Sequence, residues 1–336
     1  MPDPHFIFIL FIVGIALIFD FYNGMNDAAN SIATVVSTKV LTPKLAVAWA
    51  AFFNFVAAFG FGVKVATTIG KGVIDPLIVN EYLILSALIG AILWTAIATH
   101  IGMPISVSHS LVGGMIGAAI AKTGTSAIIT TGLNKILLFI LLSPFLGFIL
   151  GVTFMVITLW IVHRQAPSKV DKHFRILQLF SAAGYSLGHG TNDAQKTMGI
   201  IAVLLFSSGY LGQNFHVPFW LVLLCHFFIA MGTMIGGWRV IKTLGLNVTK
   251  LKPIGGFCAE TASAFTLLFT ALAGIPVSTT HTITGAIIGV GSTVRLSAIR
   301  WGIARNIIMA WIFTIPFTAL AAWIVYYILK FTLSLS

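Results

Sequence analysis

Two short motifs put carboxylate and amide side chains inside long apolar stretches. The first reads Gly24-Met25-Asn26-Asp27-Ala28-Ala29-Asn30, and the second, in the other half of the chain, reads Gly190-Thr191-Asn192-Asp193-Ala194-Gln195-Lys196. Carboxylate, amide and free carbonyl oxygens suit a hard cation such as Na⁺. Glycine beside Asn and Asp favours a break in the helix, which would expose such carbonyls and a helix N-terminus. The alternative is a polar contact that only holds helices together.

The residues expected to bind the coupling ion come from these two motifs and from one further carboxylate. Na⁺ is the metal expected at Asn26, Asp27, Asn192 and Asp193. Glu260 lies in an apolar stretch with no acidic counterpart in the first half of the chain, and a carboxylate without a fixed partner is a candidate for cation or proton coupling. The residues expected to hold the coupling ion are Asn26, Asp27, Asn30, Asn192, Asp193 and Glu260.

A second pair of matching segments carries hydroxyl groups behind a proline. Gly102-Met103-Pro104-Ile105-Ser106-Val107-Ser108-His109 returns in the second half as Gly274-Ile275-Pro276-Val277-Ser278-Thr279-Thr280-His281. Proline suits the first turn of a helix, and hydroxyls beside free backbone N–H groups can bind a small oxyanion. The alternative is ordinary helix capping. The residues expected to bind the anion are Asp27, Ser106, Ser108, Asp193, Ser278, Thr279 and Thr280.

Four further residues are expected to support this site. Lys196 follows Asp193 by three residues, so both lie on one face of a helix, and Lys196 either pairs with Asp193 or adds positive charge beside the anion. Gln195 is its neighbour in the motif, and His109 and His281 serve as ligands, gates or packing residues. The hydroxyl residues at 108 and 280 each stand next to a histidine, but adjacent residues on a helix point apart. We therefore expect no nucleophile–base pair and no enzyme.

The composition places these motifs in a membrane. Of 336 residues 58% are apolar and only 8% are charged, and the mean hydropathy is +1.02, whereas a soluble domain has about a quarter of its residues charged. Long unbroken apolar runs predict an all-α polytopic protein surrounded by lipid, because a barrel would need short alternating strands. No Walker, dinucleotide or zinc motif is present, and neither cysteine suggests a disulfide.

The positions of the basic residues indicate how the chain is oriented in the membrane. The chain carries a net charge of +11, which in a soluble protein would suggest nucleic acid. Here most Lys and Arg residues fall on the side of the basic connector around 163–175, which the positive-inside rule places in the cytoplasm. We therefore expect no nucleic-acid partner, and both termini on the outer side.

The chain repeats itself, since both pairs of motifs and the pair Pro144-Phe145 and Pro316-Phe317 recur in the same order. Each half contains an odd number of crossings, so the second half is inserted upside down. We predict a first inverted repeat over 1–163, a basic cytoplasmic connector over 164–180 and a second inverted repeat over 181–336, each repeat with broken helices and a re-entrant helical hairpin. Inverted repeats with a site near the midplane are typical of secondary transporters. A channel is the alternative of another class, although its polar residues should form a continuous line.

The paired Asn-Asp motifs and the Pro-x-Ser-x-Ser/Thr-His segments resemble those of the inorganic phosphate transporter family, and the resemblance covers nearly the whole chain. It implies a symporter of inorganic phosphate with Na⁺ or H⁺, without a further cofactor. It also implies two inverted repeats whose re-entrant hairpins meet at a central site. Many relatives have a long soluble insertion between the halves. The short connector here resembles a compact prokaryotic member in the plasma membrane, the bacterial inner membrane.

A sulfate permease on the same scaffold is the closest alternative. Bound phosphate at neutral pH can donate a proton to Asp27 or Asp193, whereas sulfate cannot and would leave these acceptors unpaired. The two carboxylates therefore favour phosphate. The sequence leaves the coupling ion open between Na⁺ and H⁺, and it leaves a homodimer open.

Overall fold

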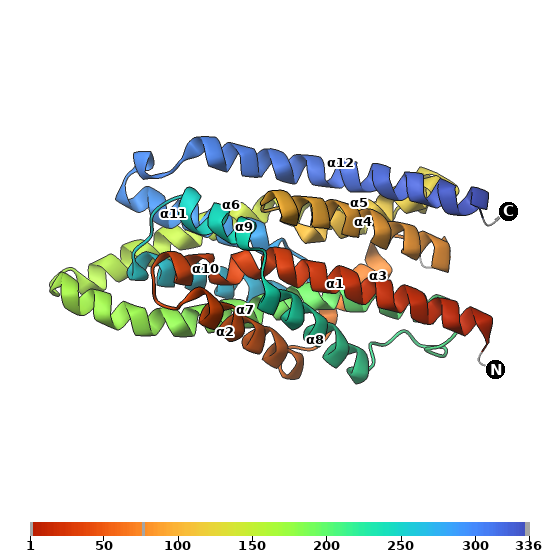
Figure 1. Cartoon of the computed structure of the whole chain (residues 1–336), viewed down its shortest axis with the longest axis horizontal. Coiled ribbons are helices and arrows are strands. Elements are labelled where there is room, and N and C mark those ends of the chain that lie inside the picture. The colour runs from red at the N-terminus through yellow and green to blue at the C-terminus, as the bar shows by residue number, and fades with distance from the viewer. Residues whose placement is uncertain (1–2, 76–77, 333–336) are drawn as a thin grey trace.

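The computed structural model describes residues 3–75 and 78–332. Within them the chain is helical apart from turns, irregular segments, short 3-10 or π segments and one isolated β-bridge between Ile74 and Ile128. The α-helices, drawn in Figure 1, are α1 (Pro4–Ser37), α2 (Pro43–Val56), α3 (Lys64–Gly72), α4 (Glu81–Ile101), α5 (Val107–Thr123), α6 (Thr130–Val162), α7 (Pro167–Ser207), α8 (Phe219–Ile235), α9 (Trp238–Lys242), α10 (Pro253–Leu272), α11 (Thr279–Val294) and α12 (Trp301–Thr332).

Proline and glycine mark the helix ends. Proline stands in the first turn of α1, α2, α7 and α10, where its missing N–H would have no partner in the helix. Gly102 directly follows α4 and Gly274 lies two residues after α10, and both have a positive φ, of 82° and 68°. Glycine adopts this left-handed conformation without steric strain. These two turns reverse the chain into the segments before α5 and α11.

Among the described residues, five helices are long and apolar enough to cross a membrane, namely α1, α4, α6, α10 and α12. Two further spans arise if each sharply bent helix pair counts as one. The segments Pro43–Phe59 and Lys64–Gly70 meet at 84°, and Phe219–Ile235 and Trp238–Gly245 meet at 65°. The expected all-α polytopic fold with broken helices is therefore observed among the described residues.

The two halves of the chain, α1–α6 and α7–α12, repeat one order of elements. Each half contains a long helix with the Asn-Asp motif, a bent pair, a hairpin that ends in a short helix, and a long outer helix with an internal proline, Pro144 or Pro316. Helix α1 starts at the end of the molecule that holds both termini, whereas α7 starts at the opposite end (Figure 1). Matching helices α1 and α7 therefore run in opposite directions.

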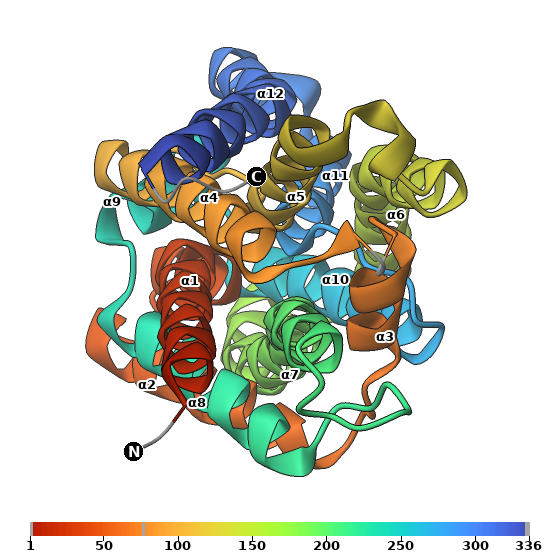
Figure 2. The same cartoon turned by 90° about the vertical axis from the view of Figure 1, so that its right-hand side faces the viewer.

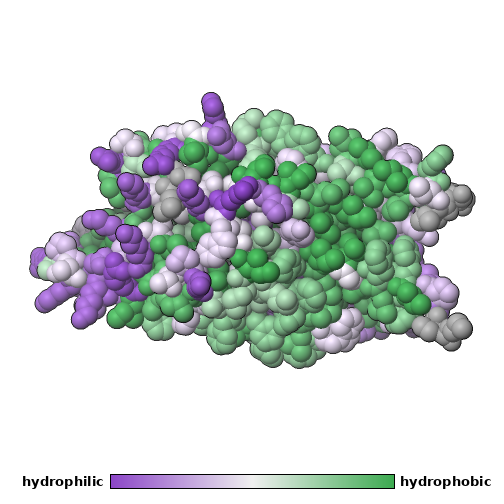
Figure 3. Space-filling view, in the orientation of Figure 1, coloured by the Kyte–Doolittle hydropathy of each residue, from purple (hydrophilic) through white to green (hydrophobic). Residues whose placement is uncertain are grey.

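Hydrophilic side chains gather at one end of the molecule, where α6 passes into α7, and apolar side chains cover most of the remaining face (Figure 3). Helix α7 begins at Pro167, so most of the expected connector over 164–180 forms the first turns of this helix. The termini lie at the other end. This is the arrangement that the distribution of basic residues predicts.

The expected helix breaks at the Asn-Asp motifs are wrong, because α1 and α7 continue through them. The glycines serve close packing instead. A Cβ atom on Gly24 would lie 2.0 Å from the carbonyl oxygen of Ile229 in α8, and one on Gly190 would lie 2.6 Å from that of Asn54 in α2. Small residues let membrane helices approach in this way. The breaks occur in the bent pairs and before α5 and α11.

Seen along its long axis, the molecule has inner and outer helices (Figure 2). Helices α6 and α12 lie at the periphery, where they cover α11 and α5. Only 22% and 28% of their most apolar windows are buried, against 67% in α10. The two short helices of the hairpins are therefore enclosed, and their N-termini lie inside the protein.

Candidate functional site

The hairpins present two matching helix N-termini, which we call the first and second tips (residues 104–109 and 276–281). Ser106 caps α5, accepting the backbone N–H of His109 at 3.3 Å, and Ser278 caps α11, accepting that of His281 at 3.2 Å. Both serines are buried. Their oxygen atoms thus satisfy one of the N–H groups that a helix start leaves free.

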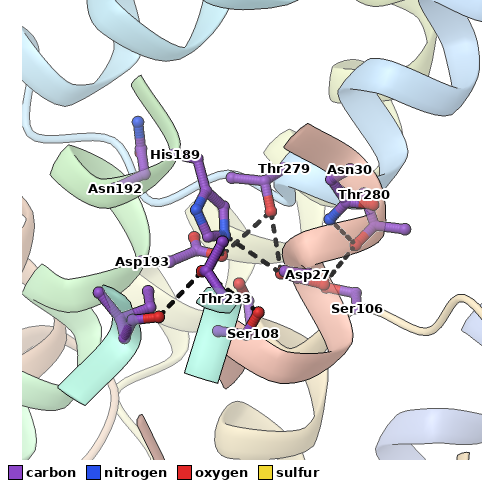
Figure 4. Close-up of polar contacts among 12 residues, drawn as sticks. Asp27, Asn30, Ser106, Ser108, His189, Asn192, Asp193, Thr233, Thr279 and Thr280 are labelled. Atoms are coloured by element: carbon purple, nitrogen blue, oxygen red, sulfur yellow. Dashed lines mark hydrogen bonds and ion pairs between the residues drawn. The ribbon is translucent and has the colours of Figure 1, made fainter. Parts of the chain in front are cut away.

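The two motif carboxylates meet at the second tip (Figure 4). The hydroxyl of Thr279 lies 3.2 Å from Oδ2 of Asp27 in α1 and 3.0 Å from Oδ2 of Asp193 in α7. All three side chains are buried. A threonine hydroxyl has only one hydrogen to donate, so it serves one carboxylate at a time. The other carboxylate needs a proton or a cation nearby.

His189 stands beside both carboxylates, and it is not among the site residues expected from the sequence. Its Nε2 lies 3.4 Å from Oδ2 of Asp193 and 3.8 Å from Oδ2 of Asp27. Its Nδ1 lies 3.1 Å from Oδ1 of Asn54 in α2, whose amide group donates to Thr233 at 2.9 Å. With Nδ1 donating to Asn54, Nε2 either carries a second proton or directs a lone pair at a cation.

Two signals in the sequence point to His189. It lies one helical turn before Asp193, on the same helical face. When the two Asn-Asp motifs are aligned, it also matches Asn23, another buried polar residue of α1. Asn54 gave no such signal, because it belongs to neither motif. Among the described residues, Asp27, His189 and Asp193 form the one group of three His, Cys, Asp or Glu side chains whose ligand atoms all lie within 4.8 Å of one another.

Lys196 links α7 to both tips. Its Nζ donates to Asp193, to Oγ of Ser108 at 2.5 Å and to the carbonyl oxygen of Val277 at 2.8 Å. The expected pairing with Asp193 is present. In the other half, Asn30 donates to Oγ1 of Thr280 at 2.9 Å, and that hydroxyl lies 3.2 Å from Oδ1 of Asp27.

The remaining motif residues contact neighbouring helices. Gln195 accepts the N–H groups of Val65 and Ala66 at 2.8 and 3.2 Å, so it caps α3. Asn26 donates to Thr99 at 2.8 Å, and Asn192 donates to the carbonyl oxygen of Leu267 at 2.7 Å. In the part of the chain that the structure describes, Oδ1 of each of these two asparagines is buried without a hydrogen-bond partner.

Glu260 lies in a separate buried cluster between α1, α7 and α10. Its carboxylate accepts hydrogen bonds from Thr34 and Ser181 at 2.5 Å each and from Gln178 at 3.0 Å. The expectation that it has no fixed partner is therefore wrong. Its partners come from other helices, which a reading of its own segment does not include.

The histidines of the two tips pack against each other. The ring centroids of His109 and His281 lie 4.5 Å apart, edge to face, and His281 stacks on Trp311 of α12 at 3.7 Å. Trp311 also donates to the carbonyl oxygen of Pro104, at 3.1 Å. This places both histidines in a packing contact between the tips and the outer helix.

The tips are closed on each other. A cavity of about 10 Å³ touches Ser108, Lys196 and Ser278, which is about enough for one water molecule. An oxyanion of four oxygens can enter only when the tips separate. The candidate site therefore combines hydroxyl donors, buried carboxylates and one ammonium group around a cavity that is too small for such an anion.

Comparison with known proteins agrees with this geometry. The model of the phosphate transporter family matches residues 23–322. A protein of Rhizobium meliloti (strain 1021) with the name "probable low-affinity inorganic phosphate transporter" is 56% identical over 94% of this chain and 95% of its own length. A Bacillus subtilis (strain 168) protein of the same name is 40% identical over 98% and 99%.

The fold is also found in a solved structure described as the sodium-dependent phosphate transporter. The two chains superpose with a TM-score of 0.86 at 28% identity, over 96% of this chain and 99% of the other. These findings confirm the polytopic helical fold and the plasma-membrane location, and they favour neither the channel nor an enzyme. The chain belongs to the phosphate transporter family.

Proposed function

We propose that this protein is a symporter that carries inorganic phosphate across the plasma membrane together with Na⁺. The observation that carries the proposal is the meeting of Asp27 and Asp193, buried in matching antiparallel helices, at the hydroxyl of Thr279. The names of the relatives support phosphate as the transported substrate, and the description of the solved structure supports Na⁺ as the coupling ion.

Phosphate would bind between the tips. The hydroxyls of Ser108, Thr279 and Thr280 and the free N–H groups at the starts of α5 and α11 are donors for its oxygens. The oxygens of Ser106 and Ser278 act as caps, which leaves their hydroxyl hydrogens as further donors. Because phosphate at neutral pH retains a proton, it can in turn donate to Asp27 or Asp193. Sulfate has no such proton, so the carboxylates disfavour it.

The negative charges of the carboxylates and of bound phosphate require a coupled cation. Asp27 and Asp193 are buried with one ammonium group, that of Lys196, in contact with Asp193. Phosphate adds negative charge to a region from which water is largely excluded, and such charge needs compensation. The carboxylates and the unpartnered amide oxygens of Asn26 and Asn192 fit Na⁺, which prefers oxygen ligands of these kinds. Glu260 is a proposed second coupling carboxylate, away from the tips.

Alternating access would use the repeated architecture. We interpret 1–163 and 181–336 as inverted repeats joined by a basic cytoplasmic segment at 164–180; residues 1–2, 76–77 and 333–336 lie outside the described part. The opposite directions of α1 and α7 and the recurring element order support this interpretation. Inverted repeats place a substrate site at their interface, where the two tips meet in this structure.

The test is uptake of labelled phosphate into proteoliposomes that contain the purified protein. We expect concentrative uptake driven by an inward Na⁺ gradient, and little uptake when K⁺ replaces Na⁺. Excess unlabelled phosphate should compete, and excess sulfate should compete poorly. Uptake driven by a proton gradient without Na⁺ would identify H⁺ as the coupling ion instead. Uptake that only equilibrates, whatever ion gradient is imposed, would contradict symport.

A further inference from the structure

One pair of matching residues breaks the symmetry of the site. When the two Asn-Asp motifs are aligned, Asn26 matches Asn192 and Asp27 matches Asp193, whereas the neutral Asn30 matches the cationic Lys196. Both residues of this unequal pair are buried, and each donates to the tip of the opposite half. The two halves therefore place different charges at equivalent positions.

Three oxygen atoms of different chemistry surround the ammonium group of Lys196. They are a carboxylate oxygen of Asp193, the hydroxyl oxygen of Ser108 at 2.5 Å and the carbonyl oxygen of Val277 at 2.8 Å. A carboxylate, a hydroxyl and a backbone carbonyl are also the groups that bind Na⁺ in transporters. The ammonium group thus occupies a site whose oxygens would suit a small monovalent cation.

The other half contains the same three kinds of oxygen. In the alignment of the two tips, Ser108 matches Thr280 and Ile105 matches Val277. Oγ1 of Thr280 lies 3.2 Å from Oδ1 of Asp27 and 3.0 Å from the carbonyl oxygen of Ile105. The side chain that reaches this group is the amide of Asn30, which carries no charge. Among the described residues, Asp193 is in contact with a lysine ammonium group and Asp27 is not, and the ring of His189 lies beside both carboxylates.

We propose that Lys196 is a tethered cation that takes the place of one transported Na⁺, so that this protein carries one Na⁺ fewer per phosphate than the same protein with asparagine at position 196. A tethered ammonium group compensates Asp193 in every state of the cycle and never dissociates, so it takes no energy from the Na⁺ gradient. The half with Asn30 must recruit its cation from solution. This inference rests on the proposed Na⁺–phosphate symport and specifies its stoichiometry.

The decisive variant is Lys196→Asn, which gives both halves the same residue. Labelled Na⁺ and phosphate fluxes, measured in the same proteoliposomes, should show the Na⁺-to-phosphate ratio rising by one. The membrane potential that just stops uptake gives the charge moved per phosphate, and this charge should also rise by one. Purified protein in detergent adds a readout independent of transport, since the dependence of its melting temperature on Na⁺ concentration should steepen as a further ion binds.

Two further variants keep the proposal testable if Lys196→Asn folds but does not transport phosphate. Asn30→Lys should lower the flux ratio by one, and the exchange variant Asn30→Lys with Lys196→Asn should restore the wild-type ratio. Lys135→Asn removes an exposed lysine of α6 and is the matched control, with no change expected. If Lys196→Asn does not transport, two measurements still test the proposal: the dependence of its melting temperature on Na⁺ concentration, and the Na⁺-to-phosphate ratio of Asn30→Lys.

The outcomes separate this inference from the proposed function. Wild-type protein without Na⁺-driven phosphate uptake would overturn the symport itself. Wild-type symport together with an unchanged ratio and unchanged Na⁺ dependence of melting in Lys196→Asn would leave the symport intact and overturn the tethered-cation role. In that case the lysine would be only a structural partner of Asp193.

Discussion

Thr279 offers the sharpest test of the site, because its one hydroxyl lies between two buried carboxylates. Thr279→Val keeps the shape of the side chain and removes the hydroxyl at 3.2 and 3.0 Å from Asp27 and Asp193. A hydrogen bond to a charged group contributes about 1.5–3 kcal/mol, and about 1.4 kcal/mol corresponds to a factor of ten in affinity. We therefore expect the half-saturating phosphate concentration to rise roughly 10- to 150-fold.

The assay is phosphate uptake by proteoliposomes at saturating Na⁺, normalised to folded protein. Thr279→Ser retains the hydroxyl and should stay near the wild type. Thr282→Val is the matched control, because the hydroxyl of Thr282 is buried in the same helix but donates to the carbonyl oxygen of Ser278, at 2.9 Å. Half-saturation unchanged by Thr279→Val, or raised equally by Thr282→Val, would refute the reasoning that Thr279 contacts the anion site.

Asp27→Asn and Asp193→Asn should each abolish uptake while leaving the amount of membrane-inserted protein near that of the wild type, and near-normal uptake by both variants would contradict the site. Ser278→Ala should lower the melting temperature by removing a cap worth about 1 kcal/mol, and it should also raise the half-saturating phosphate concentration by removing the hydroxyl hydrogen; an unchanged half-saturating concentration would leave this hydroxyl as a cap alone. Gly24→Ala should reduce the yield of folded protein, because its Cβ would lie 2.0 Å from a carbonyl oxygen of α8, whereas a Cβ on Gly14 of the same helix has nothing within 4 Å. Equal yields of Gly24→Ala and Gly14→Ala would show that α1 and α8 can separate without loss.

The class of this protein and many of the side chains that the structure gathers around Asp27 and Asp193 could be predicted from the sequence, because both depend on local properties. Apolar composition predicts membrane helices, since each helix must match the bilayer by itself. Repeated spacing relates Asp27 to Asp193 and Ser108 to Thr280 without any knowledge of their contacts. Basic residues at one end predict orientation, because the rule depends on the charge of each connector alone.

The contacts within the site depended on tertiary structure. The role of Gln195 as a cap of α3, the contact of Asn54 with His189 and the partners of Glu260 all join helices that are distant in the sequence. Glycine in the motifs predicted broken helices, because glycine has a low helix propensity and propensity describes an isolated helix. In the folded protein the same glycines allow neighbouring backbones to approach, and packing compensates the weak propensity. The sequence therefore indicated most groups of the candidate site, but not His189 or Asn54. Only the packing of helices decided which groups touch, because the distance between two side chains depends on every helix between them.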